Sequence, residues 1–147
     1  MHIPLIDLKK QYEAIKPDVD KGVLNVLSFA NFIMGENVKS FEKEFANYIG
    51  IKHSISVANG TDALIIALKA LGIGRGDEVI TSPFTFFSTA ESISAVGATP
   101  VFVDVRRDTF NIDYKKIEEK VTSKTKAIIP VHIFGQCADM DEINEIA

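Results

Sequence analysis

Cysteine is nearly absent from this 147-residue sequence, and Cys137 has no second cysteine with which to form a disulfide. A reducing compartment is therefore its simplest location. Long apolar runs are missing as well, because stretches such as residues 63–68 and 127–131 are far too short to cross a bilayer. The N-terminus lacks the basic segment and apolar core of a signal peptide. These absences predict a cytoplasmic protein that does not span a membrane.

Charge of one sign does not accumulate either. The 16 basic and 20 acidic residues are spread along the chain and give a net charge of −4. Without a basic stripe, a role in binding nucleic acid has little support. No group of cysteine and histidine residues has the spacing of a metal site, and the common glycine-rich phosphate-loop motifs do not occur. We therefore expect neither a metal ion nor a nucleic acid as a ligand.

Residues 1–50 show helical periodicity and no convincing strand. Apolar residues recur every three or four positions between Ile15 and Leu27, and Pro17 suits the first turn of that helix. The same pattern predicts a second helix around residues 38–48, which Gly50 can end.

Residues 28–35, between these two helices, are apolar but have no clean period. Two interpretations stand at this point. The two phenylalanines and the methionine of this stretch either pack in the core of the chain or cover a partner subunit.

From residue 51 onward, strands and helices alternate. Short apolar segments predict strands over residues 54–58, 78–81, 100–105 and 126–131. Helices are predicted over residues 61–71, from a capping box of Ser88 and Glu91 to Gly97, and from Asp113 through Tyr114, Ile117 and Val121. Apolar strands separated by single helices indicate an α/β fold, with a mainly parallel sheet covered by helices on both faces.

The last residues predict the start of one more helix. Asp139 and Glu142 have the spacing of a helix cap and its partner, and Ile143 and Ile146 begin an apolar face. The sequence stops about two turns into this helix, a length that is marginal without further packing. Four parallel strands also leave sheet edges that need neighbours. We therefore expect a domain over residues 51–147 that is truncated at its C-terminus.

The most specific motif is V-A-N-G-T-D-A-L at residues 57–64, where the first predicted strand meets the first predicted helix. The first N–H groups of a helix are unpaired and its dipole is positive there, which suits an anion. Gly60 allows a phosphate to approach the backbone, and Thr61 adds a hydroxyl donor. The alternative is that Asn59 and Gly60 form only a turn and that Thr61 or Asp62 only caps the helix.

Three phenylalanines follow the second predicted strand, in the loop of residues 82–88. Parallel strands bring their carboxyl ends to one edge of the sheet, so this loop is expected beside the glycine–threonine turn. One of these rings could stack on a flat aromatic ligand, a contact worth ~0.5–1.5 kcal/mol beyond burial. Core packing is the expected role of Phe84 and Phe87.

Six sequence blocks occur in one order. They are N-G-T-D-A-L (59–64), G-I-G-R-G-D-E-V-I-T (72–81), P-F-T-F (83–86), G-A-T-P-V-F-V-D (97–104), D-T-F-N-I-D (108–113) and P-V-H with G-Q (130–132 and 135–136). Together with I-P-L-I-D-L at residues 3–8, this set resembles the DegT/DnrJ/EryC1/StrS family of pyridoxal-phosphate (PLP)-dependent sugar aminotransferases. The resemblance extends over essentially every residue of the chain and about the first two-fifths of a family member.

The resemblance implies the large domain of the aspartate-aminotransferase-like fold (PLP fold type I) and a homodimer. Gly60 and Thr61 would then hold the phosphate of the PLP cofactor, and Phe86 would stack on its ring. The helical segment of residues 1–50 would lie on the dimer and substrate side, and residues 51–147 would form the first half of the PLP-binding domain. The implied reaction moves an amino group, commonly from glutamate, to a keto-sugar carried by a nucleotide diphosphate.

The resemblance also implies that no catalytic residue lies in this chain. The lysine that forms the Schiff base with PLP and the acid that faces the pyridine nitrogen both fall beyond residue 147 in the family. The lysines present lie in charged segments or beside turns and are expected to be solvated, whereas a reactive lysine must be desolvated or crowded by charge. The isolated chain is therefore predicted to be inactive. Departures from the family pattern are Phe29-Ala30, where Ser-Gly is common, and Cys137, where proline is common.

Other polar residues have less specific interpretations. His132 follows the fourth predicted strand and either contacts the substrate side or is a hydrogen-bonded structural histidine. His2 and His53 are expected at the surface, and Asp104 and Asp108 at a strand end and a turn.

Two alternative functions stay open. One is a non-catalytic module that dimerises or binds a ligand, and the other is a sugar 3-dehydrase of the same family.

Overall fold

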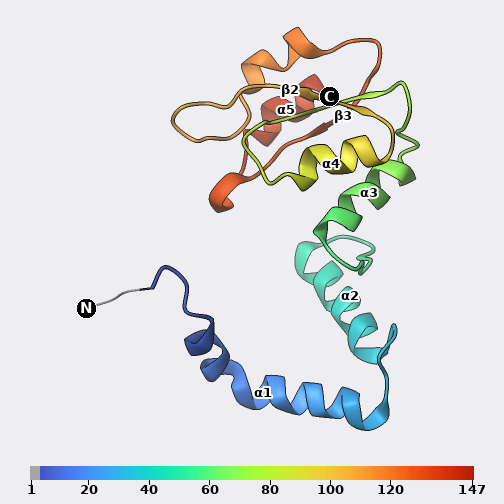
Figure 1. Ribbon diagram of the computed structural model, residues 1–147, viewed down its shortest axis with the longest axis vertical. Helices are drawn as coiled ribbons and strands as arrows, with labels where there is room; N and C mark the ends of the chain where they lie inside the picture. Colours follow the sequence, from blue (N-terminus) through green and yellow to red (C-terminus); the bar gives the residue numbers. More distant parts are fainter. Residues whose placement is uncertain (1–3) are drawn as a thin grey trace. The chain divides into compact units, whose positions relative to one another are not determined.

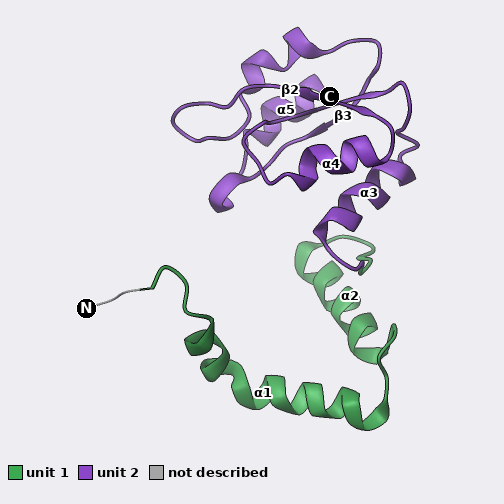
Figure 2. Cartoon of the chain, in the orientation of Figure 1, with its two compact units in different colours: residues 1–56 green, residues 57–147 purple. Residues whose placement is uncertain are grey.

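The computed structural model describes residues 4–147, so His2 and the first residue of the I-P-L-I-D-L block lie outside the described range. The chain divides into two compact units, Met1–Ser56 and Val57–Ala147 (Figure 2). Within the described range, none of the helices combines the length and the apolar character that a membrane span needs.

The first unit contains two helices, α1 (Leu8–Phe29) and α2 (Glu36–Ile49). The Asp7 carboxylate caps α1 by accepting the Lys10 N–H at 3.1 Å, so the helix begins well before Pro17. The prediction that Pro17 lies in the first turn is therefore wrong, since Pro17 is inside α1. Gly50 ends α2 as predicted, with a left-handed φ of 77° that glycine adopts without strain.

Apolar side chains of the first unit remain largely at the surface. Ala46 is the single buried residue between residues 4 and 56, and none of the residues of α1 is buried. Phe29, Phe32, Ile33 and Met34 are all exposed, Ile33 to 89%. Core packing within this chain is thus the wrong interpretation of residues 28–35.

The second unit contains a three-stranded parallel sheet in the order β2-β1-β3 (Figure 1). Its strands are β1 (Glu78–Thr81), β2 (Thr99–Phe102) and β3 (Thr125–Ile129). The helices are α3 (Gly60–Ala70), α4 (Ser88–Ala95) and α5 (Met140–Ile146). Short 3-10 turns occupy Tyr114–Lys116, Glu118–Lys120 and Ile133–Gly135.

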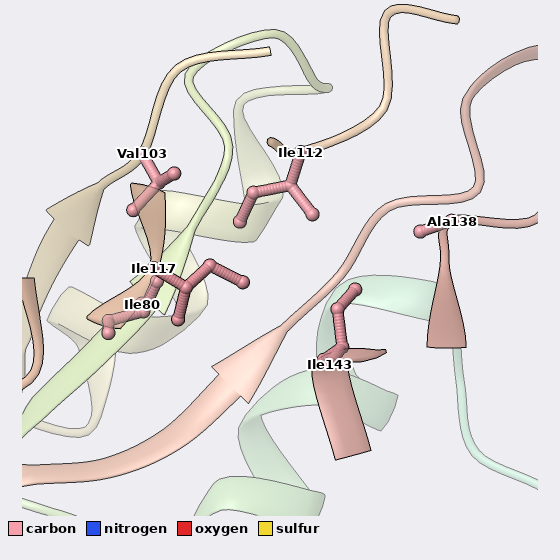
Figure 3. Close-up of a cluster of buried hydrophobic side chains, with 6 residues drawn as sticks. All are labelled: Ile80, Val103, Ile112, Ile117, Ala138 and Ile143. Atoms are coloured by element: carbon pink, nitrogen blue, oxygen red, sulfur yellow. The ribbon is translucent and has the colours of Figure 1, made fainter. Parts of the chain in front are cut away.

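Alternation along β1 divides the core into two layers. Val79 and Ile80 are both fully buried, and adjacent residues of a strand point to opposite faces. Val79 packs in a cluster with Leu68 of α3 and Ile93 of α4. On the other face, Ile80 packs in a cluster with residues of α5 and of the segments that follow β2 and β3 (Figure 3), namely Val103, Ile112, Ile117, Ala138 and Ile143. The α/β fold with a parallel sheet and helices on both faces is therefore confirmed.

Two predicted elements of this unit are absent. Residues 54–58 do not form a strand, and Ile55 is 79% exposed. A strand persists only when a neighbouring strand pairs with its backbone, and no such neighbour lies beside this segment among residues 4–147. The helix predicted from Asp113 is replaced by the 3-10 turns at residues 114–116 and 118–120, in which Ile117 is buried while Val121 is 47% exposed.

The predicted capping box of α4 is also wrong. Phe87 occupies the N-cap position and makes no side-chain capping bond, and Ser88 is the first helical residue. The predicted strand over residues 100–105 ends at Phe102, after which Val105 makes an isolated antiparallel bridge with Ile112. This bridge turns the chain back along residues 103–113 before the 3-10 turns begin.

Candidate functional site

The N-terminus of α3 is fixed by Asn59. Its side-chain Oδ1 accepts the Asp62 N–H at 2.9 Å, and its backbone carbonyl accepts the Ala63 N–H at 3.1 Å. The Asn59 amide also donates to the Asp62 carboxylate, with Nδ2 and Oδ2 3.0 Å apart. Of the first four N–H groups of α3, those of Asp62 and Ala63 are therefore satisfied.

The two remaining N–H groups belong to Gly60 and Thr61. Among residues 4–147, neither donates to a protein acceptor. A Cβ placed on Gly60 would meet no atom within 4 Å, so the space before these amides is open. Two free amides, the Thr61 hydroxyl and the positive end of an 11-residue helix form a donor set that fits a phosphate. The alternative in which Thr61 or Asp62 caps the helix is wrong, because Asn59 is the cap. The amides of Gly60 and Thr61 stay free.

Three loops meet beyond the carboxyl ends of the strands. Phe84 follows β1, Phe110 follows β2 and Phe134 follows β3. The ring centroids of Phe84 and Phe110 are 5.6 Å apart, and those of Phe84 and Phe134 are 6.2 Å apart in an edge-to-face arrangement. We call these three residues the phenylalanine cluster. The topology of the sheet brings the cluster together, because parallel strands end at the same edge.

The phenylalanine cluster contains unusual backbone. Phe110 and Phe134 have φ values of 60° and 54°, in the left-handed region that bulky residues rarely adopt. Such conformations persist only where surrounding contacts hold them, and they concentrate at binding sites.

Phe86 is 78% exposed and lies two residues before α4, where its carbonyl accepts the Thr89 N–H at 3.1 Å. Its ring, two residues along the chain from Phe84, is exposed and available for stacking on a ligand. Phe84 and Phe87 are exposed to 44% and 74%, so their predicted core packing is wrong. The continuous buried run of residues 79–82 ends at Ser82, one residue beyond the end of β1.

His132 lies three residues beyond β3 and is exposed. Its ring Nδ1 accepts the Ala138 N–H at 3.1 Å. Since a backbone amide can only donate, Nδ1 carries no proton in this arrangement, and the neutral ring holds its proton on Nε2.

Asn111 is a residue of this region whose role sequence reasoning missed. Its side chain is almost completely buried, with 2% of the residue exposed. Nδ2 donates to the carbonyls of Gln136 at 3.1 Å and Cys137 at 3.0 Å, and Oδ1 accepts the Ile133 N–H at 3.1 Å. Its partners lie 22 to 26 residues away along the chain, so no local pattern could have revealed them.

Arg106 links the loop after β2 to the start of α5. Its guanidinium pairs with Asp108 at 2.8 Å and with Asp139 at 2.9 Å. Hydrogen bonds from Arg106 lower the pKa of the Asp108 carboxyl, which identifies Asp108 as a paired turn residue. Asp139 stands at the N-cap of α5 but bonds to Arg106 in place of the helix amides. Asp104, two residues beyond the end of β2, accepts the Val105 N–H at 2.8 Å.

The predicted site residues thus fall into two groups. The loops of Phe86 and His132 are joined by the contact between Phe84 and Phe134. Gly60 and Thr61 lie on α3, and no hydrogen bond or aromatic contact within residues 4–147 joins them to the other group. No cluster of potential metal ligands occurs in the same range.

Comparison with known proteins identifies one family of related sequences. The sequence model of the DegT/DnrJ/EryC1/StrS aminotransferase family matches residues 13–147. A pleiotropic regulatory protein of Geobacillus stearothermophilus is 52% identical over 147 residues, which are 100% of this chain and 40% of that protein. The UDP-2-acetamido-2-deoxy-3-oxo-D-glucuronate aminotransferase of Pseudomonas aeruginosa is 50% identical over 99% of this chain and 40% of its own length.

A solved structure shows the same fold. The structure of NtdA from Bacillus subtilis with bound cofactor PMP superimposes with a TM-score of 0.94 at 36% identity, covering 99% of this chain and 34% of that one. The chain therefore spans about two-fifths of the length of the curated relatives that it matches.

Proposed function

This chain belongs to the DegT/DnrJ/EryC1/StrS aminotransferase family, and we propose that it is part of an enzyme that transfers an amino group to a keto-sugar linked to a nucleotide diphosphate. Glutamate is the amino donor that we propose. The observation that carries the proposal is the open N-terminus of α3, where two unpaired amides and a hydroxyl match the phosphate of the family's cofactor. The name of the 50% identical aminotransferase supports the class of substrate.

Aminotransferases of this family depend on PLP, and NtdA has the amino form of that cofactor bound. When bound, PLP supplies an electron sink that eases removal of a proton beside the amino nitrogen. The Gly60 and Thr61 amides would hold its phosphate, and the exposed ring of Phe86 would lie against its pyridine face. His132 would contact the substrate, because its loop is fixed beside the loop of Phe86.

Residues 1–147 alone are proposed to be inactive. The lysines of α1 and α2 and of the segment around residues 115–126 are exposed, whereas a nucleophilic lysine must be desolvated or crowded by charge. The lysine and the acid that complete the reaction in the family are expected outside this range. Turnover of glutamate and a keto-sugar nucleotide by residues 1–147 would contradict this.

A homodimer in the cytoplasm is the proposed state of the complete protein. The exposed apolar residues of α1 and of the segment 32–34 form a surface that a second subunit would cover. The thiol of Cys137 is free and exposed, which agrees with a reducing compartment.

The cofactor proposal is tested by following amide signals during titration with PLP. We expect the Gly60 and Thr61 signals to move with PLP and not with pyridoxal, which has no phosphate. Gly60→Asp keeps the helix, because a carboxylate is favourable in its first turn, but it places a negative charge before the amides. In this variant PLP should no longer move the Thr61 signal.

The matched control is Gly22→Asp, which adds the same charge at another helical glycine whose Cβ would meet no atom within 4 Å. It should leave the response to PLP unchanged. Equal shifts with pyridoxal and PLP, or no shift at either amide, would contradict phosphate binding at α3.

The name of the 52% identical regulatory protein favours a second candidate, a non-catalytic ligand-binding module. The two candidates differ in the complete protein. An enzyme converts the keto-sugar nucleotide with glutamate, whereas a module binds the phosphate at α3 without turnover.

A further inference from the structure

The loop of residues 132–138 is held by a single buried side chain, that of Asn111. All three of its hydrogen bonds go to backbone groups of this loop, at Ile133, Gln136 and Cys137, over 3.0–3.1 Å. The primary amide uses two donors and an acceptor together. Aspartate would keep the acceptor and lose both donors, and alanine would lose all three groups. The site therefore requires the asparagine amide itself.

The three bonds enclose the strained part of the loop. Phe134 has a φ of 54°, and it lies between Ile133, whose N–H is bound, and Gln136, whose carbonyl is bound. A left-handed phenylalanine is unfavourable by itself, so the loop needs such bonds to keep this conformation. With the loop in place, the Phe134 ring reaches Phe84.

The same conformation determines what His132 can offer to a ligand. The Ala138 N–H reaches Nδ1 at 3.1 Å only because the loop folds back over residues 133–137. That bond occupies Nδ1 as an acceptor and leaves Nε2–H as the exposed group of the neutral ring. A neutral N–H donor suits an oxygen acceptor and cannot remove a proton.

We propose that Asn111 is a positioning residue, which holds the 132–138 loop so that His132 presents Nε2–H as a hydrogen-bond donor at the carboxyl edge of the sheet. Because Nε2–H is a donor, the ligand that it binds must offer an acceptor, which is a carbonyl, hydroxyl or phosphoryl oxygen. Its identification with an oxygen of the sugar nucleotide rests on the proposed function. The state of the His132 ring and its dependence on Asn111 do not.

The test is the tautomer of His132, read from the ring nitrogen shifts of histidine-labelled protein above the pH at which the ring is charged. In the 147-residue chain we expect one tautomer, with Nδ1 unprotonated and Nε2 protonated. Asn111→Ala and Asn111→Asp should both give a mixture of tautomers. The Ala138 amide should exchange roughly tenfold faster in each, the order expected for the loss of one hydrogen bond.

Ile93→Val is the control for general destabilisation. Ile93 is fully buried but packs on the opposite face of the sheet, so this variant loses stability without touching the loop. It should keep the single His132 tautomer.

A proton on Nδ1 in the unaltered chain would overturn the proposal, even if no Asn111 variant folds. The same tautomer in the Asn111 variants would also overturn it. The tautomer and the exchange rate are measured without cofactor or substrate. Their values would therefore be the same if the protein proved not to be an aminotransferase.

Discussion

At the scale of single residues, two asparagines show what a sequence pattern can reveal. Asn59 bonds to the backbone three residues ahead, and such local caps follow from residue type and spacing. Asn111 bonds to backbone more than 20 residues away, and its type and spacing are those of an ordinary turn residue. The sequence predicted a turn at Asn59 and Gly60 followed by a helix, whereas the position of Asn111 emerged only from the folded chain.

Arg106 gives the first prediction at this scale, which concerns acid stability. Because Arg106 lowers the pKa of Asp108 in the folded state, this pair stabilises the fold above about pH 4, where the unfolded carboxyl is ionised. That stability is lost as the pH falls through the lower, folded pKa. In Arg106→Gln, the urea midpoint of unfolding should therefore fall less steeply as the pH drops below 4.

Arg75→Gln is the matched control, because Arg75 is exposed and forms no ion pair within the described residues. In this variant the urea midpoint should fall below pH 4 as steeply as it does in the unaltered chain. If the urea midpoint fell equally steeply below pH 4 in both variants, a stabilising role of the ion pair between Arg106 and Asp108 would be contradicted.

At the scale of elements, the period of apolar residues and the position of glycines predicted most of the helices and the three strands of the sheet. The predicted segments 61–71 and 78–81 appear as α3 and β1 within one residue of the expected ends. The segment 54–58 has equally apolar character but forms no strand, because strand formation depends on a partner. The helix predicted from Asp113 did not form although Ile117 is buried, since burial follows the apolar side chain and the helix also needs regular backbone bonds.

The second prediction concerns the start of α3. Asn59→Ala removes the acceptor of the Asp62 N–H and should lower the free energy of unfolding by ~0.5–2 kcal/mol, as measured in urea. Asn59→Asp retains a cap oxygen and should stay close to the unaltered chain. A larger loss for Asp than for Ala would show that repulsion between the introduced carboxylate and Asp62 outweighs the cap oxygen.

At the scale of the whole molecule, the two units differ in how much apolar surface they bury. The second unit has a core on both faces of its sheet, including Val79, Ile80 and Ile93 with no exposed surface. The first unit buries Ala46 alone between residues 4 and 56. Helices without a buried face are marginal in water, so the stability of the described chain resides in the second unit.

The third prediction follows from this difference and uses hydrogen exchange. The amides of β1 should exchange slowest, and those of α1 should exchange fastest among the helices, because local opening of α1 exposes no core. Raising the protein concentration should slow exchange in α1 and leave β1 unchanged if the proposed homodimer covers its apolar residues. Strong protection of α1 at low concentration would contradict the marginal stability of this unit.

The sequence by itself determined the parallel α/β architecture, the helix start at Asn59-Gly60-Thr61 and the family, because each depends on local periodicity, local capping or ordered motifs. Only the tertiary structure decided that Phe84, Phe110 and Phe134 meet and that Asn111 holds the loop of His132. These contacts join segments that are far apart in the chain. The type of a residue limits which groups its side chain can bind, but the arrangement of the strands decides which residues of the chain come close enough to bind it.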